Sequence, residues 1–69
     1  MERHPVASSN LAEVGYDPDL EILEIMFQNC SVYQYYNFPN FMFERFMASG
    51  SLGGFFNTEI KRHYQEARM

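Results

Sequence analysis

Residues 32–39 read Val32-Tyr33-Gln34-Tyr35-Tyr36-Asn37-Phe38-Pro39 and hold four aromatic rings within six positions. Side chains alternate between the two faces of a β-strand, so a Tyr-x-Tyr pair places two hydroxyl-tipped rings on one face. Such a pair either anchors the core of a small domain or forms a surface on which a ligand stacks. The stretch therefore predicts a strand that ends before Pro39, and it leaves both roles of the rings open.

Two further strands are predicted upstream of this stretch. Residues 11–16 form the first, and the turn chemistry of residues 17–19 follows it. Residues 21–27 are rich in aliphatic and aromatic side chains and form the second strand. Residues 28–31 are typical of a hairpin turn. Together with residues 32–37, these segments predict a three-stranded antiparallel meander.

The length of the hairpin turn decides the role of the tyrosine pair. A two-residue turn pairs Phe27 with Val32 and places Tyr33 and Tyr35 opposite the aliphatic face of the second strand. A three-residue turn with a bulge pairs Phe27 with Tyr33, which places the rings on that aliphatic face. The size and acidic charge of the chain favour the core position, because a small domain needs its large rings for packing.

The periodicity changes at Pro39, a residue that suits the first turn of a helix. The apolar stripe of this helix is Met42, Phe43, Phe46 and Met47. Gly50 fits the end of the helix, and Ser51 fits the N-cap of a second short helix. The second apolar set is Phe55, Phe56, Ile60 and Tyr64. The prediction is an α+β domain of order β-β-β-α-α, with both helices packed on one face of the sheet.

The 69 residues are enough for one domain. We expect residues 1–8 to be a disordered lead-in and residues 9–66 to form the domain. The single cysteine, Cys30, cannot form an internal disulfide, and we see no signal peptide. No stretch approaches the ~20 apolar residues of a membrane span. These features indicate a cytoplasmic protein with no membrane partner.

The net charge of −4 argues against strong nonspecific binding to nucleic acid. Residues 61–69 nevertheless carry Lys61, Arg62 and Arg68 against one acid, so a basic patch is expected only at the C-terminus.

The sequence contains no convincing catalytic or metal-binding motif. Asp17, Asp19 and Glu21 alternate as calcium ligands do, but the required Gly and Glu are missing from the sixth and twelfth positions. The two histidines and the cysteine lack the spacing of zinc ligands, and there is no phosphate-binding glycine loop. We therefore expect a non-enzymatic protein without a cofactor or a bound metal. Asn57 is expected to tie the second helix to a neighbouring segment through a hydrogen bond.

Four stretches within residues 9–64 together resemble a known family. They are Ser9-Asn10-Leu11 with Val14-Gly15-Tyr16-Asp17; Leu23-Glu24-Ile25-Met26-Phe27; Val32-Tyr33-Gln34-Tyr35 with Phe38-Pro39; and Ser51 and Gly53 with Phe55-Phe56-Asn57 and Ile60-Lys61. In this order they resemble the KTSC domain, a module named after the C-terminus of some lysyl-tRNA synthetases. The resemblance implies a compact domain of unknown biochemical role that is suspected of binding RNA. Leu52 and Gly54 stand where family members often carry Lys or Arg.

Two functional hypotheses follow. In the first, the chain is an accessory RNA-binding module in which Tyr33 and Tyr35 stack on bases while Lys61 and Arg62 contact phosphates. In the second, it is a protein-interaction or self-association module that binds a protein partner or forms a homo-oligomer. The interaction patch of this module would contain Phe41 and Leu52, because both fall outside the two apolar stripes.

Overall fold

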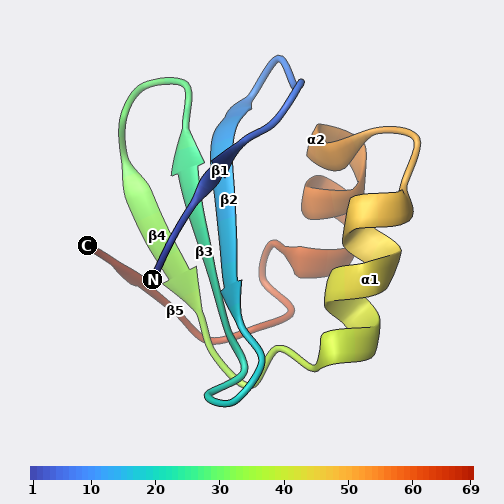
Figure 1. Cartoon of the computed structure of the whole chain (residues 1–69). Coiled ribbons are helices and arrows are strands. Elements are labelled where there is room, and N and C mark those ends of the chain that lie inside the picture. The colour runs from blue at the N-terminus through green and yellow to red at the C-terminus, as the bar shows by residue number, and fades with distance from the viewer.

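A five-stranded antiparallel sheet forms one layer of the molecule, and two short helical segments cover one of its faces (Figure 1). The computed structural model describes residues 1–69. The order along the sheet follows the chain: β1 (His4–Pro5), β2 (Leu11–Asp17), β3 (Ile22–Phe27), β4 (Val32–Tyr35) and β5 (Glu66–Arg68). The predicted α+β class and the antiparallel sheet are confirmed, but the sheet has five strands and not three.

The two strands that the sequence does not reveal lie at the edges of the sheet. β1 falls within residues 1–8, which we expected to be a disordered lead-in, and there His4 pairs with Val14 of β2. β5 follows the last helix, and its Ala67 pairs with Gln34 of β4. Both strands are too short to show an apolar alternation. They form because β2 and β4 offer unpaired backbone groups to them.

The tyrosine pair lies on the helix-covered face of the sheet. Tyr33 is opposite Ile25, and Tyr35 is opposite Leu23, so the rings share the face of the aliphatic side chains. Of the two alternatives, this is the arrangement expected from a turn with an odd number of residues.

The hairpin turn differs from both alternatives in its position. The backbone N–H of Phe27 donates to the carbonyl of Ser31 (2.9 Å), so the loop consists of residues 28–30. Phe27 therefore faces Ser31 and not Tyr33. Cys30 closes the loop in the left-handed region, with φ of 69°. A left-handed last residue is usual in three-residue hairpin loops.

The predicted helices are present and begin where expected. α1 (Asn40–Ala48) starts directly after Pro39. α2 (Leu52–Phe55) has Ser51 at its N-cap, whose hydroxyl accepts from the N–H of Gly54 at 3.0 Å. α2 then widens into a single π-helical segment, η1 (Phe56–Ile60). Neither α2 nor α1, the longest helix at nine residues, is long and apolar enough to cross a membrane.

The core lies between the sheet and the helices and is strongly aromatic. Phe38 and Phe46 are fully buried there, and Phe46 contacts Phe55 with ring centroids 5.5 Å apart. Met47, which the apolar stripe includes, is 42% exposed and lines a surface groove. The buried hydrophobic residues are Leu11, Val14, Leu23, Ile25, Tyr35, Phe38, Met42, Phe46, Phe56 and Ile60.

The N-terminal residues cross the open face of the sheet (Figure 1). They pass over Gly15, where an added Cβ would lie 2.5 Å from the carbonyl oxygen of Glu2. Arg3 then donates hydrogen bonds to Glu13 (2.9 Å) and to Glu24 (2.6 Å). This crossing requires a residue without a side chain at position 15. The hydrogen bonds of Arg3 then hold the crossing segment in place.

The bond to Glu24 continues into a polar network on the open face. The amide of Gln34 donates to Glu24 at 2.7 Å, and the hydroxyl of Tyr36 donates to Gln34 at 2.9 Å. Burial raises the pKa of Glu24, but the hydrogen bonds from Gln34 and Arg3 outweigh it and hold the pKa below its ordinary value. Glu24 is therefore a carboxylate that stays charged at neutral pH although it is only 8% exposed.

Candidate functional site

The predicted pair of stacking tyrosines is divided by the fold. Tyr35 is only 2% exposed and packs edge-to-face against Phe56, with ring centroids 5.7 Å apart. This burial raises the pKa of its hydroxyl above the ordinary value. Tyr35 is a core residue, so a base cannot stack on it in this structure.

Tyr33 remains half-buried and is part of a small group of rings. It contacts Phe27 edge-to-face at 5.9 Å, and Phe27 in turn contacts the buried ring of Phe56 at 5.3 Å. The guanidinium carbon of Arg68 lies 6.0 Å from the centroid of the Tyr33 ring. The structure thus offers two partly exposed rings, Phe27 and Tyr33, in place of the predicted tyrosine pair.

The two predicted cations have different surroundings. Lys61 is exposed at the end of η1, and with Phe27 it lines a hollow of about 400 Å³. Arg62 is also exposed, in the left-handed region with φ of 68°, and does not line that hollow. The structure brings Lys61 together with an aromatic ring but gives Arg62 no such neighbour. We define Phe27, Tyr33, Lys61 and Arg68 as the aromatic–basic surface.

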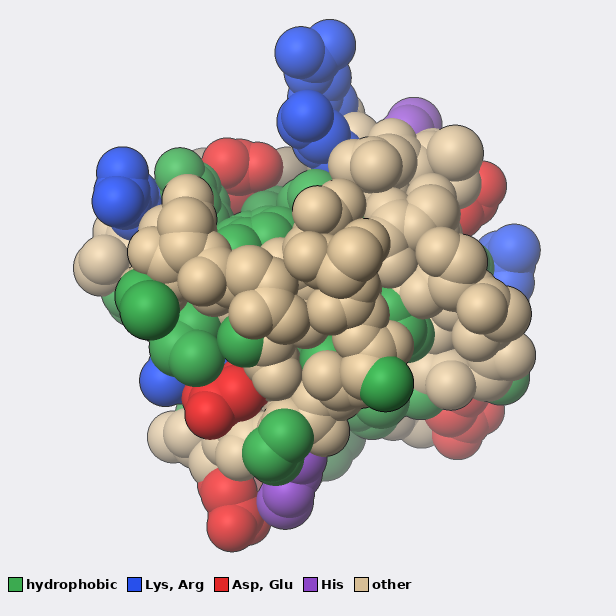
Figure 2. All heavy atoms as spheres, turned by 90° about the horizontal axis from the view of Figure 1, so that it is seen from above, with side chains coloured by type: hydrophobic (Ala, Val, Ile, Leu, Met, Phe, Trp, Pro, Cys, Tyr) green, Lys and Arg blue, Asp and Glu red, His purple; other side chains and the backbone are tan.

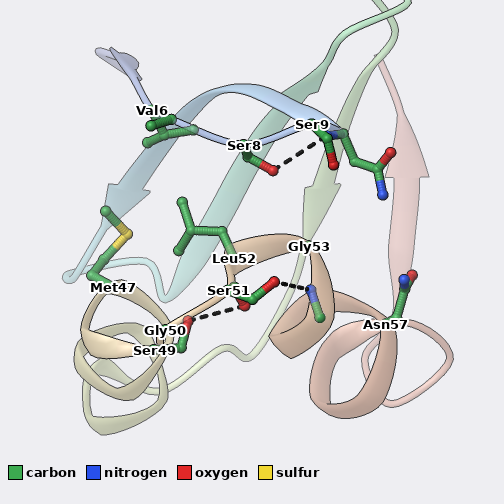
Figure 3. A pocket seen from close by; sticks show the side chains of 13 residues that line it. Val6, Ser8, Ser9, Met47, Ser49, Gly50, Ser51, Leu52, Gly53 and Asn57 are labelled. Atoms are coloured by element: carbon green, nitrogen blue, oxygen red, sulfur yellow. Dashed lines mark hydrogen bonds between the residues drawn. The ribbon is translucent and has the colours of Figure 1, made fainter.

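A larger groove of about 530 Å³ adjoins this surface (Figure 3). Its walls are residues 6–10 on one side and residues 49–54, after α1, on the other. Val6, Met47 and Leu52 lie at one end of the groove, and Asn57 lies at the other. Asn10 and Asn57 line both the groove and the hollow beside Lys61, so the two adjoin each other, and we call them together the depression.

The depression is polar but nearly neutral. Figure 2, which looks onto this end of the molecule, shows a central surface made mostly of backbone and uncharged polar side chains, with charged groups mainly towards its rim. Such a surface can form directional hydrogen bonds but does not attract an anion by charge alone.

Small polar residues and a glycine build the walls of the groove. Ser8 accepts hydrogen bonds from the N–H groups of Asn10 and Leu11, both at 3.2 Å, which turns the chain into β2. Ser51 caps α2 in the same manner. A Cβ added at Gly53 would come within 3.5 Å of the Asn10 amide. These small residues let the two walls approach each other closely.

The side-chain amides of Asn10 and Asn57 are free to bind a ligand. Both residues are exposed, and neither amide forms a hydrogen bond within the protein. The expected tie from Asn57 to a neighbouring segment is absent, because η1 points this side chain into the groove (Figure 3). π-Helical segments often occur at functional sites.

The second set of predicted residues does not form one patch. Phe41 is 62% exposed in the first turn of α1, whereas Leu52 is half-buried and lines the groove beyond the other end of that helix. The length of α1, about 1.5 Å per residue, separates the two side chains. No three His, Cys, Asp or Glu side chains gather where they could hold a metal ion.

The sequence did not indicate Phe27 and Asn10 as site residues, whereas Arg68 belongs to the expected C-terminal basic patch. Phe27 reads as a core residue of its strand, and only its place beside the turn hints at exposure. Arg68 reaches Tyr33 through β5, a strand that the sequence does not predict. The motif stretches around Asn10 and Asn57 were the available signal for the groove.

The chain is similar to known proteins over nearly its whole length. A sequence model of the KTSC domain matches residues 7–64. An uncharacterized protein of Stutzerimonas stutzeri is 36% identical over 70 residues, covering 100% of this chain and 99% of that protein. A protein of Tsukamurella paurometabola is 36% identical over 61 residues, covering 88% and 91% of the two chains.

A crystal structure supports the same relationship. A KTSC domain protein from Yersinia pestis superposes with a TM-score of 0.95 at 38% sequence identity, covering 99% of this chain and 96% of that one. Because sequence and fold both match, this chain belongs to the KTSC domain family.

Proposed function

We propose that this KTSC domain is a non-catalytic accessory module that binds short single-stranded RNA at the aromatic–basic surface. The observation that carries the proposal is the contact between two partly exposed rings, Phe27 and Tyr33, with Lys61 beside one ring and Arg68 over the other. Rings flanked by cations suit a single strand, because bases stack on the rings while phosphates meet the cations.

The neighbouring groove supplies the groups that could distinguish one base from another. The free amides of Asn10 and Asn57 each offer a donor and an acceptor within the depression that Lys61 also lines. A base placed beside Phe27 would present its edge to these amides. Sequence preference in this proposal therefore comes from the groove, and binding energy comes from the rings.

The affinity should be weak. Stacking contributes about 1–3 kcal/mol per base, so two rings supply about 2–6 kcal/mol, and the midpoint of that range corresponds to a dissociation constant near 1 mM. The net charge of −4 adds no general attraction. Two phosphate contacts give a salt dependence of about −0.7 each, or a slope of about −1.4 in log K against log salt.

An NMR titration with short single-stranded RNA tests the proposal. Chemical-shift changes should map to Phe27, Tyr33 and Lys61 and weaken as salt is raised. The variant Lys61→Gln should weaken binding, whereas Arg45→Gln, the same charge change on α1, should not. Absence of shifts up to about 1 mM RNA would overturn the proposal, and so would equal effects of the two variants.

The alternative of a protein-interaction patch has less support. Phe41 is a single exposed ring, and Leu52 does not extend it. Isolated exposed apolar side chains are common on protein surfaces. Shifts centred on Phe41 on adding a protein partner, with none on adding RNA, would reverse this preference.

A further inference from the structure

β5 is an open edge of the sheet. It pairs with β4 on one side and with nothing on the other, and Figure 1 shows it with the C-terminus on the side away from α1. The carbonyl of Gln65 accepts from Tyr36, and the N–H of Met69 donates to Val32, so alternate residues of the segment bond to β4. By the alternation of an antiparallel ladder, the N–H and C=O groups of Glu66 and Arg68 point outward.

We propose that β5 is a self-association edge that pairs antiparallel with β5 of a second copy, around a two-fold axis at Ala67. In this register, Glu66 of each copy faces Arg68 of the other, and each pair exchanges both backbone hydrogen bonds. The opposite charges lie side by side on one face, which stabilises the pair. The contact is isologous, as a two-fold dimer requires.

The side chains of β5 select this register over its neighbours. An axis at Glu66 would place two carboxylates opposite each other, and an axis at Arg68 would do the same to two guanidinium groups. Like charges directly opposite destabilise a strand pair. Ala67 would sit at a non-hydrogen-bonded position, where the chains approach most closely and a small side chain fits. The sequence Glu66-Ala67-Arg68 is therefore complementary to itself when reversed.

The other edge of the sheet is closed to such pairing. β1 has two residues, and one of them is Pro5, which has no N–H to donate. β5 has no proline, and Glu66 and Arg68 are exposed. The two edges thus differ in the way expected if only one of them serves as a contact between copies.

The association should be weak because the paired segment is short. Its interface falls well below the area of stable dimers. Pairing would join two sheets into one and bring the two copies of Arg68, and hence of Tyr33, to the junction. This inference goes beyond RNA binding and does not depend on it.

Charge reversal tests the proposal. Sedimentation at low salt, from about 20 µM to about 1 mM, should show reversible self-association of the natural chain. Glu66→Arg and Arg68→Glu should each weaken it about tenfold, because each places like charges opposite one another. Mixing these two variants should restore association. The Glu66→Arg variant carries cations at positions 66 and 68, and these face the two carboxylates of the Arg68→Glu variant. The double variant should also associate.

A matched control and a local readout complete the test. Glu59→Arg makes the same charge change at an exposed position of η1 and should leave association unaltered. Hydrogen exchange at the amides of Glu66 and Arg68 should slow as concentration rises. A monomer at every concentration would overturn the proposal. Single variants that associate like the natural chain, or a mixture that fails to associate, would overturn it equally.

Discussion

Arg3 donates a 2.6 Å hydrogen bond to Glu24, a residue 21 positions away on β3. The bond passes over β2 at Gly15 and holds the N-terminal residues against the open face of the sheet. Glu24 is nearly buried, so it needs a hydrogen-bonding partner to remain charged. The pair therefore explains both how the N-terminal residues are held against the sheet and why a carboxylate is stable on this face.

The first prediction concerns acid stability. The pKa of Glu24 lies below its unfolded value of 4.5, so its contribution to stability is fully present above that value. The contribution is lost as pH falls through the lower folded pKa. Unfolding free energy measured by urea titration should fall steeply below pH 4.5 in the natural chain. Glu24→Gln should flatten this part of the profile. An unchanged acid slope in the variant would contradict the assignment.

The second prediction uses two glycines as a matched pair. Gly15→Ala places a methyl group 2.5 Å from the Glu2 carbonyl, so the backbone must shift and stability should fall by about 1–3 kcal/mol. Gly50→Ala meets nothing within 4 Å and should change stability by less than about 0.5 kcal/mol. Thermal unfolding of both variants provides the measurement. Equal losses would show that residues 1–5 do not pack against Gly15.

The third prediction concerns alkaline stability. Burial, with Glu66 nearby, raises the pKa of Tyr35 above its unfolded value of 10.0, so the folded chain keeps this proton longer. Stability is then fully present below pH 10 and is lost as pH rises through the folded pKa. Tyr35→Phe should reduce the loss above pH 10. Tyr33→Phe is the control, and above pH 10 it should lose more stability than Tyr35→Phe does.

The fourth prediction tests the hairpin. Cys30 adopts φ of 69°, a region that costs a non-glycine residue about 1–2 kcal/mol. Cys30→Gly should therefore raise the unfolding free energy by up to about 1 kcal/mol. Cys30→Ala keeps the β-carbon and should bring no such gain. A loss of stability in the glycine variant would argue against the three-residue loop.

The central strands and both helix starts are predictable because their signals are local. The alternation in residues 21–27, Pro39 before α1 and the Ser51 cap each specify structure from a few neighbouring residues. The side of the sheet occupied by Tyr33 depended on the length of one turn. That length is set by backbone conformation at Cys30, a residue type that gives little indication of a left-handed turn.

The edge strands and the site are less predictable because they depend on contacts distant in sequence. β1 and β5 have no periodicity of their own and form only against β2 and β4. The aromatic–basic surface requires β5 to bring Arg68 to Tyr33. The groove requires residues 6–10 to face residues 49–54. Sequence motifs mark the residues involved but do not show that they meet.

The most direct test of the proposed function is a search for NOE contacts between the protons of a short RNA and the aromatic rings of the domain. We expect contacts from base protons to Phe27 and Tyr33, with none to the buried ring of Tyr35. Contacts only at Phe41, or no contacts while RNA is present at about 1 mM, would contradict it.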